Sequence, residues 1–133
     1  MRKLCADFHT HTTYCDGKST PRQMVEAAYS MGLTDFGISG HADYSMWEPG
    51  FGMSDAILSA YKQELEILRE EYAGKMNIYI GIELDTLGPV QQAEYAIGST
   101  HSILKDGHLV TVDARRKSWC RLWKHSGTAT GMP

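Results

Sequence analysis

Two histidines, His9 and His11, lie two residues apart near the start of the sequence, within the run Asp7-Phe8-His9-Thr10-His11. On an extended backbone, side chains alternate between two faces, so these imidazoles would point the same way. Imidazole is a common metal ligand in proteins. A pair of imidazoles on one face, at the end of a strand, predicts half of a binuclear hydrolase site.

Four further residues of ligand type follow along the chain, each where an apolar, strand-like run gives way to polar residues. They are Asp16, His41, Glu83 and His101. A His-x-His pair alone is a weak motif, because closely spaced histidines also arise by chance. The four additional residues make a metal site the better interpretation. A mixed set of nitrogen and oxygen ligands suits Zn, Mn or Fe better than Ca or Mg.

The cysteines and the first residues bear on the compartment. Cys5, Cys15 and Cys120 are odd in number and lack zinc-finger spacing, so we expect reduced thiols. Cys15 lies in the loop after the histidine pair and would offer a thiolate ligand, but the neighbouring Asp16 suits the site better. Residues 1–3 leave no room for a removable signal peptide, and no apolar run reaches the length of a membrane span. These features predict a soluble, cytoplasmic protein with no membrane partner.

Four motifs, in order, resemble those of the polymerase and histidinol phosphatase (PHP) superfamily. They are DFHTHTTYCD at 7–16, SGHAD at 39–43, GIE at 81–83 and GSTH at 98–101. The resemblance covers about residues 3–113. Within the superfamily, the spacing of the GIE and GS-x-H motifs is most similar to that of the histidinol-phosphatase branch.

The resemblance implies a distorted (β/α)7 barrel, similar to a TIM barrel, with two or three divalent metal ions in the intact site. His9 and His11 would hold one metal, Glu83 would bridge two, and His101 would bind the second. The substrate would be a small phosphorylated molecule. The implied reaction is that of histidinol-phosphatase, which converts L-histidinol phosphate to L-histidinol and phosphate in histidine biosynthesis.

The two remaining ligand-type residues are assigned to the catalytic side of the site. Asp16 and His41 would serve a third metal or face the phosphate. Phosphomonoesters hydrolyse extremely slowly without a catalyst, so their enzymes need strong electrostatic stabilisation. Divalent metals supply it by acidifying a bound water and offsetting the charge of the phosphate oxygens.

The order of the predicted elements indicates the fold class. Strands are predicted at 3–8, 34–39, 77–83 and 95–98, and helices at 21–31 and 54–73. Strand, loop, helix and strand within about 35 residues form a βαβ unit, which favours a parallel sheet. Ligand-type residues at the C-terminal ends of such strands are typical of a (β/α) barrel. Because the chain supplies only four or five strands, it predicts a partial, truncated α/β barrel.

Start signals and apolar stripes define the two helices. Thr20 and Gln23 form a capping box for the first helix, and Met24 and Met31 recur at helical spacing as core residues. Ser54 is expected to cap the second helix. The apolar stripe of that helix is Ile57, Leu58, Tyr61, Leu65 and Leu68.

The composition of two further segments predicts loops. Residues 43–53 follow His41 directly and are rich in Gly, Trp and Met, so we expect them over the mouth of the site. There, Trp47 and Phe51 would either shape a substrate pocket or cover the barrel rim. His108 follows a Gly in a turn-like run and is expected to be an exposed loop residue.

The charge pattern changes near residue 113. Residues 1–113 hold 8 lysines and arginines against 16 acidic residues, whereas residues 114–133 hold 5 basic residues and no acid. The later His and Asp-x-His that the resemblance implies are absent, so we expect impaired activity of this chain. We predict an N-terminal part of a PHP domain at 1–113. For residues 114–133, a frameshifted or truncated gene product competes with a basic interaction tail.

Three functional hypotheses remain from the sequence. A metal-dependent, histidinol-phosphatase-like phosphomonoesterase is the favoured one. Another PHP phosphoesterase, acting on nucleotides or DNA ends, is the alternative, although the acidic balance of residues 1–113 argues against a nucleic-acid partner. The third is a non-catalytic fragment that binds metal. The sequence carries no feature that defines an oligomeric state.

Overall fold

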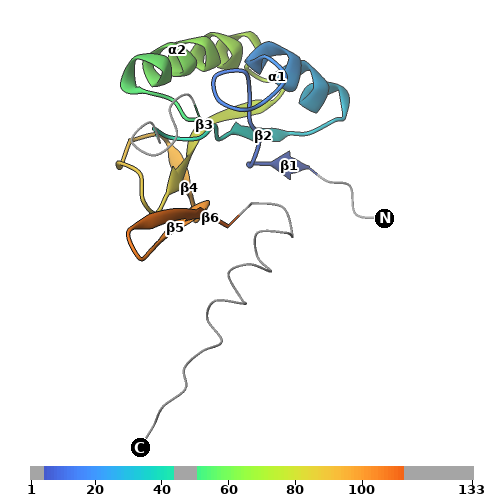
Figure 1. Cartoon of the computed structure of the whole chain (residues 1–133). Coiled ribbons are helices and arrows are strands. Elements are labelled where there is room, and N and C mark those ends of the chain that lie inside the picture. Colours follow the sequence, from blue (N-terminus) through green and yellow to red (C-terminus); the bar gives the residue numbers. More distant parts are fainter. Residues whose placement is uncertain (1–4, 44–50, 113–133) are drawn as a thin grey trace, which may run out of the picture. The chain divides into compact units, whose positions relative to one another are not determined.

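The computed structural model describes residues 5–43 and 51–112, which belong to two compact units, Met1–Ser99 and Thr100–Pro133. The first unit contains a four-stranded sheet in the order β1-β2-β3-β4 (Figure 1). Its strands are β1 Ala6–Asp7, β2 Asp35–Ile38, β3 Asn77–Asp85 and β4 Tyr95–Ser99. All three neighbouring pairs are parallel. This curled, parallel sheet is part of a TIM-like barrel, as the sequence predicted.

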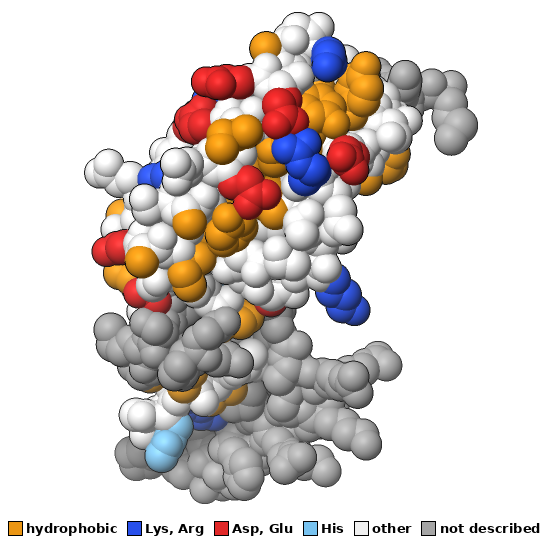
Figure 2. Space-filling model, turned by 90° about the horizontal axis from the view of Figure 1, so that it is seen from above, with side chains coloured by type: hydrophobic (Ala, Val, Ile, Leu, Met, Phe, Trp, Pro, Cys, Tyr) orange, Lys and Arg blue, Asp and Glu red, His pale blue; other side chains and the backbone are white. Residues whose placement is uncertain are grey.

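Two helices cover one face of the sheet, α1 at Pro21–Ser30 and α2 at Asp55–Glu71 (Figure 1). The predicted capping box is present, because the Thr20 side chain accepts from Gln23 N and the Gln23 side chain accepts from Thr20 N. Ser54 occupies the N-cap position of α2, but its side chain makes no capping hydrogen bond. The helical side shows acidic and basic side chains interspersed with apolar ones (Figure 2).

The hydrophobic core lies between these helices and strands β2 and β3. Its members include Val25, Ala28, Phe36, Ile38, Leu58, Leu65, Leu68, Ile78, Ile80 and Ile82. The expected core role of Met31 is wrong, because this side chain is 70% exposed, and Met24 is only partly buried. The buried face of α1 consists of Pro21, Val25 and Ala28 instead. In α2 the predicted stripe is buried except for the exposed Ile57.

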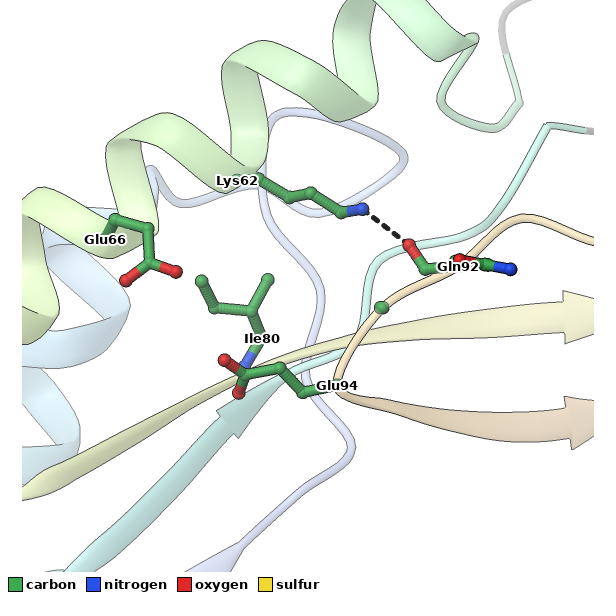
Figure 3. A pocket seen from close by; sticks show the side chains of 6 residues that line it. Lys62, Glu66, Ile80, Gln92 and Glu94 are labelled. Atoms are coloured by element: carbon green, nitrogen blue, oxygen red, sulfur yellow. Dashed lines mark hydrogen bonds between the residues drawn. The ribbon is translucent and has the colours of Figure 1, made fainter.

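The connection between β3 and β4, residues 86–94, contains no helix, although parallel strands are usually joined by one. This connection leaves a cavity of about 310 Å³ beside α2 (Figure 3). Lys62 reaches from α2 and donates a hydrogen bond of 2.5 Å to the carbonyl of Gln92. Ile80 of β3 lines the same cavity, together with Glu66 and Glu94.

The second unit contains an antiparallel hairpin that was not predicted from the sequence. Its strands are β5 Ser102–Lys105 and β6 His108–Thr111. Asp106 and Gly107 form the turn, with φ angles of 51° and 76°. Positive φ at both turn residues matches the twist of a tight hairpin. His108 is exposed, as expected, but it begins a strand rather than lying in a loop.

Several predicted features lie outside the described residues. They are Trp47, the boundary at residue 113 and the tail 114–133. Within the described ranges, no helix is long and apolar enough to cross a membrane.

Candidate metal centre

The histidine pair follows β1 directly and is tied to β2 by the residue between the two imidazoles. Thr10 Oγ1 donates to the carbonyl of Gly37 at 2.9 Å, and the carbonyl of Thr10 accepts from Ser39 N at 2.9 Å. The alternation of an extended backbone then turns both His9 and His11 the same way. Both imidazoles reach the same atom, Oε2 of Glu83.

Glu83 lies near the C-terminal end of β3 and is only 4% exposed. Its Oε2 is 3.2 Å from His9 Nε2 and 3.0 Å from His11 Nε2. His41 follows the end of β2, where an isolated β-bridge joins it to Glu83. Its Nδ1 is 3.3 Å from the same Oε2. The structure therefore brings three of the six residues singled out from the sequence around one oxygen of a fourth, the buried Glu83.

This donor set fits a divalent metal ion. A carboxylate oxygen offers about two lone pairs, so three imidazole N–H groups on Oε2 would exceed its acceptor sites. Metal bonds of about 2.0–2.2 Å place neighbouring ligand atoms roughly 3.0–3.6 Å apart. The N···O separations of 3.0–3.3 Å at Glu83 lie within that range. His9, His11 and Glu83 would hold one such ion.

Asp16 lies on the other side of two of these imidazoles. Its Oδ1 is 3.0 Å from His11 Nδ1, and its Oδ2 is 3.5 Å from His41 Nε2. A metal-bound histidine commonly donates its second ring N–H to a carboxylate, which fixes the ring orientation. His11, Asp16 and His41 also form a second group whose ligand atoms lie within 4.8 Å of one another. Asp16 is thus placed to orient His11 or to bind a cation with His41.

The loop after the histidine pair holds Asp16 and Cys15 close to the imidazoles. Cys15 Sγ is 3.5 Å from His11 Nδ1. This hydrogen bond raises the pKa of His11 to about 9 in the metal-free protein, against the opposing effect of burial. Burial acts to raise the pKa of Cys15, but hydrogen bonds with His11 and the backbone outweigh it and lower that pKa. The loop therefore favours negative charge beside the cluster.

The pKa of Asp16 moves in the same direction as that of Cys15. Partial burial acts to raise it, but the nearby charges of His41 and His11 outweigh burial and lower the pKa of the carboxyl. Asp16 is about half exposed, so solvent screens much of this interaction. The carboxylate form that a metal or an imidazolium requires is therefore present at neutral pH.

The predicted roles of His101 and Phe51 in the site are not tested by this structure. His101 follows β4 and belongs to the second unit, where its carbonyl accepts from Val112 N at 2.7 Å. Its role as a metal ligand stays a prediction. Phe51 packs against His41, with ring centroids 4.3 Å apart. Its role in substrate binding also stays a prediction.

The hydrogen-bonding roles of two tyrosines near the centre were not predicted from the sequence. The hydroxyl of Tyr95 donates to the carbonyl of Phe8, just after β1, and that of Tyr61 donates to the carbonyl of Ile38, at the end of β2. Gly37 and Gly81 leave space for the Tyr95 side chain. A glycine inside a strand pattern often marks a close approach of another group. Gly37 and Gly81 were therefore the available signal.

Replacing Gly17 with alanine is expected to distort the loop that carries Asp16. A Cβ at this position would overlap the backbone of His11 and Thr12. Gly17 N also donates to the carbonyl of Thr12 at 3.0 Å, so a shift would break that hydrogen bond. Overpacking of this kind should lower the free energy of unfolding by about 1–3 kcal/mol. Urea denaturation would measure the loss.

The matched control for this prediction is Gly98→Ala. A Cβ at Gly98 of β4 would meet no atom within 4 Å. This variant should therefore change the free energy of unfolding by less than about 0.5 kcal/mol. Equal losses in the two variants would contradict the steric explanation.

The fold and the cluster together define a class of protein. It is a partial barrel of the (β/α) type, with a candidate metal site at the C-terminal ends of its parallel strands. The chain belongs to the PHP domain family, whose model matches residues 7–129.

Similar proteins include two named relatives and one solved structure. A probable histidinol-phosphatase of Deinococcus radiodurans is 30% identical over 114 residues, covering 76% of this chain and 43% of that protein. The histidinol-phosphatase of Lactococcus lactis is 34% identical over 84 residues, covering 63% of this chain and 30% of that protein. A crystal structure of a candidate histidinol phosphatase from Listeria monocytogenes has a TM-score of 0.72 at 21% identity, covering 86% of this chain and 51% of that one. The chain thus spans less than half the length of these two relatives.

Proposed function

We propose that this chain carries part of the active centre of a metal-dependent PHP phosphoesterase that hydrolyses a small phosphomonoester. The favoured substrate is L-histidinol phosphate, which would give L-histidinol and phosphate. The observation that supports the proposal is the convergence of three imidazoles on one buried carboxylate oxygen, at N···O distances of 3.0–3.3 Å. The two relatives named above support the choice of substrate.

The proposed residues divide into those that hold metal and those that face the substrate. His9, His11 and Glu83 would hold one ion, and Glu83 has a second oxygen with which to bridge to another. Bound divalent metals would acidify a water molecule and offset the charge of the phosphate oxygens. Asp16, about half exposed, and the imidazole of His41 would lie on the side from which phosphate approaches.

Two alternatives differ in class. Another PHP phosphoesterase would act on a nucleotide or a DNA end, and residues 1–113 carry twice as many acidic as basic residues, which disfavours a polyanionic substrate. A non-catalytic metal-binding protein would hold the ion and release no phosphate.

Removal and return of metal tests the proposal. We expect chelator-treated protein to release no phosphate from histidinol phosphate, and Mn, Zn or Fe to restore a release that is weak, as expected for a chain of impaired activity. Phosphate release should be compared with that from a nucleoside monophosphate, since preferential cleavage of the nucleotide would favour the first alternative. Metal uptake without any hydrolysis would support the non-catalytic alternative. The absence of both metal uptake and hydrolysis would refute the proposed centre.

A further inference from the structure

We propose that Tyr95 is a positioning residue of the metal centre, because its hydroxyl holds the backbone segment that presents His9 and His11. This inference rests on the proposed function of that segment as a metal ligand. It concerns a residue of β4 that contributes no atom to the cluster itself.

Tyr95 links the two ends of the four-stranded sheet. Its side chain starts on β4, and its hydroxyl donates a hydrogen bond of 2.8 Å to the carbonyl of Phe8, just after β1. These two residues are 87 positions apart in the sequence. The ring of Phe8 also meets the Tyr95 ring edge-on, with centroids 5.9 Å apart and planes at 86°.

Two glycines allow the Tyr95 ring to cross the intervening strands. A Cβ at Gly81 of β3 would overlap this ring, and a Cβ at Gly37 of β2 would overlap its hydroxyl. Both glycines are buried and have ordinary backbone angles, so close approach explains them better than turn geometry does. The ring therefore lies against β3 and β2 and reaches the segment that follows β1.

The segment that carries the histidines has few backbone pairs to support it, because within the described residues β1 pairs with β2 at two positions, Ala6 and Asp7. Beyond Asp7, Thr10 bonds to β2 on one side of His9, and Tyr95 holds the carbonyl of Phe8 on the other. Loss of the hydroxyl would release the Phe8 side and allow His9 to move.

The two imidazoles should respond differently to that loss. The His9 side chain is 51% exposed, and its Nε2 contacts Glu83. His11 is 20% exposed, and its second ring nitrogen is also held by Asp16 at 3.0 Å. His9 should therefore depend on Tyr95 more than His11 does. Such a difference is not expected from a general loss of stability.

The test compares Tyr95→Phe with Tyr79→Phe. Tyr79 also contacts the ring of Phe8, with centroids 5.3 Å apart, but its hydroxyl donates to Asp35 Oδ1 at the start of β2. Titration of the metal-free full chain with Zn or Mn should show about 10-fold weaker binding in Tyr95→Phe, the loss typical of an outer support of a ligand. Tyr79→Phe should change the affinity by less than about 2-fold.

Imidazole NMR signals of the metal-free chain provide a second readout. In Tyr95→Phe, the ring signals of His9 should shift or broaden more than those of His11, whereas Tyr79→Phe should leave both in place. Unchanged affinity together with unchanged His9 signals would overturn the inference. If the wild-type chain binds no metal, the proposed centre fails, and the His9 signals alone then decide whether Tyr95 holds the segment.

Discussion

Replacing Glu83 with glutamine is expected to weaken divalent metal binding by at least about 100-fold, beyond the loss typical of an outer support. Glutamine keeps the shape of the side chain but removes the charge that offsets the cation. Without metal, the Glu83 carboxylate is paired with His11, whose pKa is raised to about 9, so glutamine removes the partner of a protonated imidazole and should lower the stability of the metal-free protein as well. The substitution should therefore lower stability both with and without metal, and by more when metal is present.

Thermal and urea unfolding with and without metal would measure both losses. At a metal concentration 100 times the wild-type Kd, the wild-type chain should gain about 2.7 kcal/mol from binding, and Glu83→Gln should lose most of that gain. Glu71→Gln is the control, because Glu71 is an exposed carboxylate paired with Arg22 on the helical side. A full metal-induced gain in Glu83→Gln would refute the role of this carboxylate.

The gathering of the four clustered residues could be predicted because it follows from local rules. Alternation along a strand places His9 and His11 on one face, and the parallel order of β2 and β3 brings their C-terminal ends together. Asp16 was also placed near the cluster by the short loop that carries it. The family resemblance pointed to the same residues and the same barrel.

The buried face of α1 could not be chosen from the sequence. Met24, Ala28 and Met31 recur at helical spacing, but Pro21, Val25 and Ala28 do so equally well. Two apolar stripes therefore overlap on one short helix, and only packing against the sheet and α2 selects the second. The hairpin β5–β6 was missed for a related reason, because each strand carries two adjacent apolar residues rather than a strict alternation.

The hydrogen bonds of Tyr61 and Tyr95 could not be predicted from local sequence patterns either. The hydroxyl of Tyr61 finds partners 20 and 23 residues away, and that of Tyr95 finds one 87 residues away. In the sequence, Tyr61 was recognised only as part of an apolar stripe. Its hydrogen bonds depend on how α2 lies across the strands, which periodicity does not specify.

Replacing Tyr61 with alanine is expected to lower the free energy of unfolding by about 3–5 kcal/mol, the usual cost of deleting a fully buried aromatic ring. Tyr61 is 0% exposed, and its hydroxyl lies 2.6 Å from the carbonyl of Ile38 and 2.8 Å from that of Gly81. Ile38 ends β2, and Gly81 lies two residues before Glu83. The side chain thus joins α2 to both strands just below the metal cluster.

Tyr61→Phe separates the hydroxyl from the ring in this prediction. It keeps the packing but leaves two buried carbonyls without that donor, so it should cost about 1–3 kcal/mol. Tyr29, which is 45% exposed on α1 and packs on Tyr72, provides the matched pair of variants. Tyr29→Phe should cost less than about 0.5 kcal/mol, and Tyr29→Ala should cost less than Tyr61→Ala. Urea denaturation of all four variants would measure these changes in the free energy of unfolding. Equal losses for the two phenylalanine variants would show that the Tyr61 hydroxyl does not hold β2 and β3 together.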